Sequence, residues 1–448
     1  MRGTRVHVDV AGHRQEPFID PRTAITAAMR DSLDYLPDCP FRDFYAWVLS
    51  EPRCQQRWLQ LLGIEGLIRL SGALLNGLMD AEESDRLTVY SAPLLVYLTY
   101  EAISDNLAIG LAGPAPGDGS YPARAGLVRA FNDAMLARLD GATAASVRGR
   151  VLRWTTAPGQ ISMFRQSLSE TEHRALVAAY AKAHPGADPA AIEFTAAPAL
   201  IANIESAVTA AQSLAGLRTA GLFREGLARR YAAVTELLTS RGPALEELVA
   251  LGTDAILVIP TLAYYAGLIA EVVRPMAGYH DLVDDGLLNE ALAHAALLVR
   301  VLNDCGTGLA EQGAGQRRAL ISDLHALARS RRSATLSDVL RQAALAHGRL
   351  LTRISKDLSF GEFNICLDGI RDLPVSAGAV PAFEHRLHRV CASYQRSQRG
   401  LQGATRRMTR RLRTDVISAI VLRFVEFHRL MYADSFTTAS GEYAIARS

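Results

Sequence analysis

Apolar residues recur at spacings of three and four along most of the chain. From about Asp20 onward, Ala-, Leu- and Arg-rich segments of roughly 12 to 25 residues show this period, which is that of an α-helix. Val6, Val8 and Val10 alternate like a short strand, but almost nothing after them does. The pattern therefore predicts an all-α protein built as a large helical bundle.

Short stretches rich in Pro and Gly separate the helical segments. None is long enough for an interdomain linker, and the chain shows no repeat of fixed period. The breaks fall at residues 113–124, 184–189, 240–243, 274–280, 311–316 and 373–381.

The most apolar stretch, Ala255–Ala270, has 16 residues and contains Pro260, which is short of the roughly 20 residues needed to cross a bilayer. We expect a buried core helix there and no membrane span. The N-terminal residues lack the apolar core of a signal peptide, so a cytoplasmic protein is expected. The cysteines are odd in number and show no CxxC spacing, which argues against a disulfide framework or a zinc site; they are Cys39, Cys54, Cys305, Cys366 and Cys391.

The charges nearly cancel, with 48 Lys+Arg against 46 Asp+Glu, which argues against a chain that binds polyanions over its whole surface. One segment differs, because residues 386–413 contain nine arginines and no acid, with His388 and Tyr394 among them. Three interpretations stay open: a solvated helix face whose arginines pair with acids elsewhere, a lid over a substrate diphosphate, or a surface for nucleic-acid phosphates.

The segment Leu287–Glu311 is predicted to be one long helix. Asn303, Thr307 and Glu311 are spaced i, i+4, i+8 in it, so an amide oxygen, a hydroxyl and a carboxylate should follow one face. Oxygen ligands of this kind suit Mg²⁺ shared with substrate phosphates, and Arg300, one turn earlier, is placed to reach a phosphate oxygen. The alternative is an ordinary polar stripe in which Thr307 bonds to a main-chain carbonyl.

Acidic residues on a second helix are candidates for the facing ligands. Glu101 and Asp105 are spaced i, i+4 in an otherwise apolar and aromatic segment, where two acids are costly unless they are paired or bind metal. Pairing with an arginine is the alternative. The acids of His280–Asp285 form a competing cluster, but the Pro and Gly around it favour a helix start that acids stabilise.

Asn303-Asp304-x-x-Thr307-x-x-x-Glu311, preceded by Arg300, resembles the second metal-binding motif of class I terpene synthases. These enzymes are all-helical and use three Mg²⁺ ions to ionise an isoprenyl diphosphate. The resemblance implies that Asn303, Thr307 and Glu311 ligate Mg²⁺ while Asp304 is structural. Glu101 and Asp105 would occupy the first and last positions of the family's Asp-rich motif.

Other segments are similar to parts of the same family. Residues 226–255 resemble its helix–Pro–helix, and Ala255–Arg274 would be its broken core helix, with Gly267 near the kink. Gly252 falls where the family has a diphosphate-sensing arginine, and Arg429 and Tyr432 are candidates for its C-terminal Arg-Tyr pair. Four tyrosines would flank the pocket unless they are plain core residues: Tyr97, Tyr100, Tyr264 and Tyr265.

The resemblance implies a bundle of the class I terpenoid synthase type. Residues 1–90 would be an N-terminal helical extension packed on the core, and residues 91–448 an α-helical catalytic domain with an insertion around 113–225. The implied partner is an isoprenyl diphosphate and the implied cofactor is Mg²⁺. Catalytic roles fall to Arg300, Tyr97 and Tyr264, and substrate binding to Arg300, Arg429 and Tyr432. The competing function is nucleic-acid binding through residues 386–413, and a homodimer is left open.

Overall fold

The computed structural model describes residues 20–433 apart from 109–110, 113–120, 156–169, 194–195, 241, 312 and 332. Within these residues it contains 19 α-helices and no strand beyond an isolated bridge between Thr335 and Pro374. The predicted all-α class is confirmed, while the terpenoid synthase type of bundle stays a prediction. The expected strand at Val6–Val10 lies outside the described residues.

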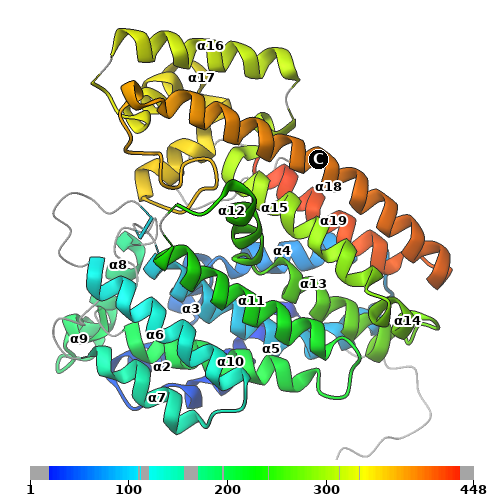
Figure 1. Cartoon of the computed structure of the whole chain (residues 1–448). Coiled ribbons are helices and arrows are strands. Elements are labelled where there is room, and N and C mark those ends of the chain that lie inside the picture. Colours follow the sequence, from blue (N-terminus) through cyan, green and yellow to red (C-terminus); the bar gives the residue numbers. More distant parts are fainter. Residues whose placement is uncertain are drawn as a thin grey trace, which may run out of the picture.

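The N-terminal half supplies the lower part of the molecule as it is drawn in Figure 1. Three of its first helices begin with proline, at Pro21, Pro40 and Pro52, where the missing N–H costs no hydrogen bond. The helices of this half are α1 (Pro21–Asp31), α2 (Pro40–Ser50), α3 (Pro52–Leu61), α4 (Ile64–Leu75), α5 (Ala81–Ala108), α6 (Tyr121–Leu139), α7 (Ala144–Leu152), α8 (Glu170–Ala183), α9 (Pro189–Glu193), α10 (Ala196–Ser213) and α11 (Ala220–Thr239).

The C-terminal half supplies the top of the molecule, with α16 and α17 at one end and the long helix α18 along the outside, while α13 and α14 lie lower, and α13 packs on α11 (Figure 1). Thr335 starts α17 with a capping box, because it and Asp338 satisfy each other's main-chain N–H groups. The helices of this half are α12 (Leu245–Asp254), α13 (Val258–Gly267), α14 (Tyr279–Asp284), α15 (Leu287–Glu311), α16 (Ala314–Ser330), α17 (Leu336–Phe360), α18 (Ala379–Leu412) and α19 (Val416–Met431).

The two halves share one hydrophobic core that runs from Ile25 to Phe424. The most extensive packing joins α15 to α18 and α5 to α10, and α13 contacts helices of both halves. The predicted boundary at residue 90 lies inside α5, a helix of this core. The range 113–225 includes α10, so part of the predicted insertion lies in the centre of the bundle.

The central helix changes from α-helical to π-helical at Gly267, the residue near which the resemblance places a kink. All ten residues of α13 are buried, and a π-helical turn, Leu268–Val273, follows Gly267 directly. Gly267 packs against the side chain of Thr219 so closely that a Cβ there would collide with it. Among the described residues no single helix is long and apolar enough to cross a membrane. Two pairs of consecutive helices, each bent at a short break, reach the necessary length and apolar composition only when the pair is taken together.

Candidate functional site

The helix that carries the predicted metal ligands is broken at Gly306. This residue has φ 77° and ψ 157°, a conformation that is essentially restricted to glycine. Asn303 lies before the break, and Thr307 and Glu311 lie after it. The prediction that all three follow one face of a continuous helix is therefore wrong, because the helical register does not hold across Gly306.

Two tertiary hydrogen bonds replace the helical bond that the break removes. In an unbroken helix the N–H of Thr307 would donate to the carbonyl of Asn303. Here that N–H donates to the carbonyl of Tyr432 at 3.2 Å, and the Asn303 carbonyl accepts from Nε of Arg353 at 2.7 Å. The break is thus held open by the end of α19 on one side and by α17 on the other.

Side chains at the break are also engaged. Oδ1 of Asn303 accepts from Arg353 at 2.6 Å, and the hydroxyl of Thr307 donates to the carbonyl of Arg429 at 2.5 Å. The Thr307 contact is the carbonyl bond that the alternative interpretation of the motif predicts, although it reaches another helix. Thr307 thereby satisfies a carbonyl that the C-terminal end of α19 leaves without a helical partner.

Glu311 lies at the surface beside the end of α19. One carboxylate oxygen accepts from the hydroxyl of Tyr394 at 2.9 Å, and the other is 3.3 Å from Nη1 of Arg429. Arg429 also pairs with Glu426 at 2.6 Å. These residues border an open surface hollow that is lined by Ala310, Glu311, Tyr394, Gln395, Gln398, Glu426 and Arg429.

Arg300 and Asp304 form a buried ion pair one turn before the break. Arg300 also donates to the carbonyl of Phe363 at 3.3 Å, and its guanidinium lies 4.9 Å from the centre of that ring. The other oxygen of Asp304 accepts from the N–H of Ile365 at 2.8 Å. Burial raises the pKa of Asp304, while the Arg300 charge opposes that rise. Both carboxylate oxygens of Asp304 therefore have donors within the protein.

The sequence did not identify the partners that α17 and the following loop supply. Arg353 and Asp357 are spaced i, i+4 on α17, and Asn364 donates to Asp357 at 2.7 Å and to the Asp304 carbonyl at 2.9 Å. Charged residues at that spacing beside apolar Leu351, Ile354 and Leu358 are the signal that could have found them. We call Arg300, Asn303, Asp304, Arg353, Asp357 and Asn364 the α15–α17 polar cluster.

Glu101 lies in a separate buried network formed by α5, α10 and α11. One carboxylate oxygen pairs with Arg230 at 2.5 Å, and the other accepts from Tyr231 at 2.8 Å. Asn203 and Ser104 donate to the second oxygen as well, at 2.8 Å and 3.1 Å. The arginine-paired alternative thus describes Glu101, because both of its oxygens already have donors.

Asp105, one turn further along α5, connects the two regions electrostatically. Its side chain is 74% exposed and lies 3.7 Å from Arg230. Its carboxylate is also within electrostatic reach of Glu101, Glu362 and Lys356. Lys356 in turn lies 3.6 Å from Asp357 of the α15–α17 polar cluster.

The tyrosines proposed for the pocket are fully buried and hydrogen-bonded. The hydroxyl of Tyr97 lies 2.8 Å from that of Tyr231, and the hydroxyl of Tyr264 lies 2.7 Å from Ser213 and donates to the carbonyl of Tyr90 at 3.0 Å. Both lie in the hydrophobic core, as the alternative interpretation has it. A catalytic role for either stays a prediction.

Two acids of the competing segment His280–Asp285 form ion pairs. Asp284 pairs with Arg218 at 2.5 Å, and Asp285 pairs with Arg411 and accepts from the N–H of Leu287 at the start of α15. His280 lies 3.2 Å from Glu271. These contacts fit the helix-start interpretation.

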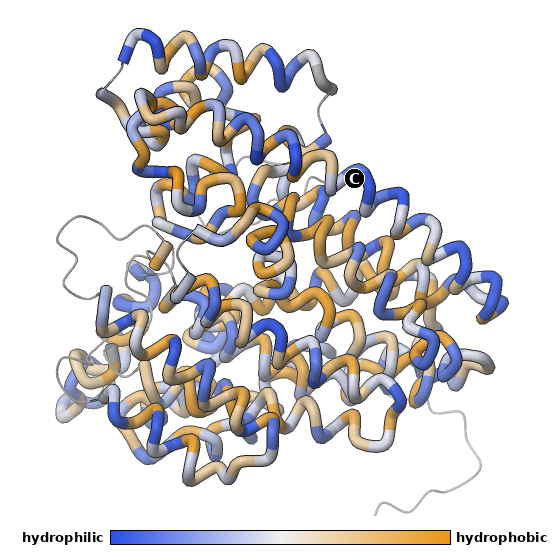
Figure 2. Tube along the Cα trace, in the orientation of Figure 1, coloured by the Kyte–Doolittle hydropathy of each residue, from blue (hydrophilic) through white to orange (hydrophobic). Residues whose placement is uncertain are grey.

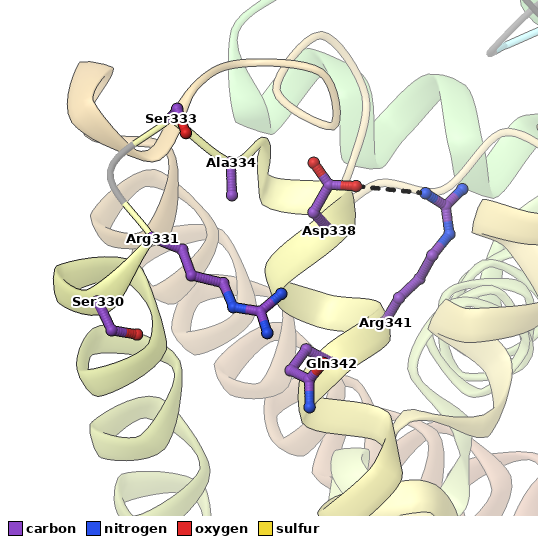
Figure 3. Close-up of a pocket in the computed structure, with 7 residues that line it drawn as sticks. All are labelled: Ser330, Arg331, Ser333, Ala334, Asp338, Arg341 and Gln342. Carbon is purple, nitrogen blue, oxygen red and sulfur yellow. Dashed lines mark ion pairs between the residues drawn. The ribbon is translucent and has the colours of Figure 1, made fainter.

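A second surface hollow lies between the end of α16 and the start of α17, away from every predicted site residue. Figure 3 shows Arg331 extending into it, with Arg341 turned toward Asp338, its ion-pair partner at 3.9 Å. The remaining lining residues are Ser330, Ser333, Ala334 and Gln342. It is open to solvent and contains none of the motif residues.

The cysteines are free thiols. Sγ of Cys305, on α15, lies 3.8 Å from Sγ of Cys366, and both are buried. In the part of the chain that the structure describes, no three His, Cys, Asp or Glu side chains are arranged so that they could hold a metal ion. Comparisons with protein families, with curated proteins and with solved structures found no match for this chain.

Proposed function

We propose that the protein is a class I terpene synthase-like enzyme that binds an isoprenyl diphosphate with the diphosphate near the end of α15. One observation carries the proposal. The residues that the resemblance selects on α15 and α19 are joined by direct contacts, although more than a hundred residues separate Thr307 from Arg429 in the chain. The residues so joined are Asn303, Thr307, Glu311, Arg429 and Tyr432, with Arg353 linking Asn303 to Tyr432.

A partly exposed guanidinium at the end of α15 supports anion binding. Arg300 and Arg353 are buried and held by Asp304 and Asn303, whereas Arg429 lies beside Glu311 and its side chain is 34% exposed. A guanidinium binds phosphate oxygens through two parallel N–H bonds, so Arg429 is suited to neutralise a departing diphosphate. Its ion pairs with Glu311 and Glu426 are of the weak surface kind.

Mg²⁺ is the cofactor that the resemblance implies, and its fit can be examined from the donor atoms. An amide oxygen, a hydroxyl and a carboxylate are suitable donors. In this arrangement these donors do not fit one ion. Asn303 accepts from Arg353 and the Thr307 hydroxyl donates to a carbonyl, and the non-helical conformation of Gly306 turns the two side chains away from a common face. We therefore assign the binding of the diphosphate to Arg429.

The test is turnover by the full-length protein. Prenyl diphosphates of 10 to 25 carbons are supplied with and without Mg²⁺, and hydrocarbon products and released diphosphate are measured. We expect release from one chain length, and we expect Arg429→Gln to raise KM by about tenfold, because one charge-assisted phosphate contact is lost. Arg389→Gln, which removes an exposed ion pair with Glu246 on α12, is the matched control and should leave KM unchanged.

Two results would contradict the proposal. If no chain length is turned over under either condition and inorganic pyrophosphate does not bind, the proposed function is wrong. Binding of pyrophosphate that Arg429→Gln does not weaken would overturn the assignment of the diphosphate to the end of α15.

A further inference from the structure

Helix α18 lies on the outside of the molecule and carries the arginine-rich segment. It has 34 residues, and its inner face packs on α15 and α19 through residues such as Phe383, Leu387 and Met408. Hydrophilic positions recur along its outer edge (Figure 2). Arg396 donates to the hydroxyl of Ser393 within the helix at 2.8 Å, and the structure separates the other eight arginines of residues 386–413 into two groups, which the sequence could not do.

The first group is used by the fold. Arg389 pairs with Glu246 at 2.6 Å, Arg407 pairs with Glu290 at 2.5 Å, and Arg411 pairs with Asp285. Arg386 donates to the carbonyls of Ile365 and Asp368. These four hold α18 to its neighbours, as the solvated, acid-paired interpretation predicts.

The second group is exposed and has no ion pair or side-chain hydrogen bond to any residue that the structure describes. It consists of Arg399, Arg406, Arg410 and Arg413. We call these four the free arginine stripe. Spacings of seven and four residues put Arg399, Arg406 and Arg410 on one side of the helix, over a length of about 16 Å. Arg413 continues the stripe just beyond the end of the helix.

Like charges lie close together in this stripe. Arg406 and Arg410 are spaced i, i+4, so their side chains are neighbours on one face of α18. Glu290 and Asp285, the nearest acids that pair with α18 at this end, are already occupied by Arg407 and Arg411. A row of uncompensated positive charges is the form of surface that a chain of phosphates neutralises.

We propose that the free arginine stripe is a binding surface for the phosphate backbone of a nucleic acid. Gln402 and Gly403 lie between Arg399 and Arg406, so this part of the stripe offers no apolar side chain for insertion into a bilayer. Tyr394 is buried and hydrogen-bonded to Glu311, so it does not stack on bases. Binding through phosphates alone is independent of sequence and strongly dependent on salt. This inference is independent of the proposed function.

The experiment measures binding of labelled 20-nucleotide single-stranded RNA and 20-base-pair duplex DNA of random sequence to the full-length protein, between 50 and 200 mM salt. The test variant is Arg406→Gln with Arg410→Gln. The matched control is Arg389→Gln with Arg407→Gln, which removes the same charge from the same helix but at ion-paired positions. The two nucleic acids show which source of phosphate is preferred.

We expect the test variant to bind at least about tenfold more weakly and to lose about two from the slope of log affinity against log salt, since each lost phosphate contact lowers the slope by about one. The control should weaken binding by less than about threefold, since its arginines stay committed to the fold. Turnover of prenyl diphosphates should be equal in both variants.

Three outcomes would overturn the inference. The first is the absence of salt-sensitive binding to either nucleic acid. The second is an equal loss in the test and control variants, which would assign binding to overall charge. The third is retention of the protein on phosphatidylserine-containing vesicles, lost in the test variant, without binding to nucleic acid, which would assign the stripe to membranes.

Discussion

Arg353 donates two hydrogen bonds to Asn303, one to the main-chain carbonyl at 2.7 Å and one to Oδ1 at 2.6 Å. The same guanidinium lies 4.8 Å from the centre of the Tyr432 ring. One buried side chain of α17 therefore holds both the last helical turn before the break in α15 and the end of α19. Removal of this side chain should consequently destabilise the break in α15 and the end of α19 together.

Replacing Arg353 tests this link. Arg353→Met keeps an apolar stem but leaves two acceptors of Asn303 without their donors, so we expect a loss of about 2 to 4 kcal/mol in the free energy of unfolding. Urea unfolding measures it. Asn303→Ala and the double variant complete a cycle, in which the two losses should fail to add by about 1 kcal/mol or more. Additive losses would mean that the two residues act separately.

The break itself depends on glycine at position 306. Gly306→Ala should lower the free energy of unfolding by about 1 to 3 kcal/mol, because the φ of 77° is strained for any residue with a Cβ. Its Cβ would also meet the Arg353 side chain at 3.3 Å. Gly308→Ala is the control two residues away, where a Cβ makes only ordinary contacts at 3.5 Å or more, and it should be neutral or slightly stabilising. Thermal unfolding of the two variants measures the difference. Equal losses of stability in Gly306→Ala and Gly308→Ala would argue against strain at Gly306.

These two positions show what the sequence could and could not predict. The period of apolar residues was sufficient to predict α15 and its polar side chains, because both depend on neighbours within a few turns. It could not predict the break, because the groups that hold it open, Arg353 and the Tyr432 carbonyl, lie 50 and more than 100 residues away. Gly306 was visible as a weak point of the helix, but only tertiary contacts reveal that the weak point is used.

The acids of α5 show the same limit. Their spacing placed Glu101 and Asp105 near one another on a helix, but the two residues differ in exposure to solvent. Glu101 is 4% exposed, whereas the side chain of Asp105 is 74% exposed. The partner that distinguishes them, Arg230, comes from α11. On α18, composition showed an excess of arginine, while the division into paired and free arginines depends on acids of α12, of the turn after α14 and of the start of α15.

Neutralising the two acids of α5 should therefore have unequal effects. Glu101→Gln keeps the shape of the side chain but leaves the buried Arg230 without its closest counter-charge, so we expect a loss of about 3 to 5 kcal/mol in the free energy of unfolding. Asp105→Asn should change it by no more than about 0.5 kcal/mol, as is usual for surface positions. Denaturant unfolding of both variants is the measurement. A Glu101→Gln protein as stable as the parent would mean that the charge of Glu101 is not needed for folding.

His173 should make the protein sensitive to mild acid. It is 1% exposed between Phe44 and Trp58, and burial lowers its pKa to about 4 from the ordinary 6.5. As the pH falls below 6.5, the unfolded chain gains a proton at this residue that the folded protein does not accept until about pH 4. Stability must therefore fall over this interval, by about 2 kcal/mol between pH 7 and pH 5 from His173 alone. His173→Phe should remove this share of the pH dependence in urea unfolding at the two pH values. Phe44→Leu, a packing change in the same cluster, should lower stability equally at both, and an unchanged pH dependence in His173→Phe would show that His173 is not the source.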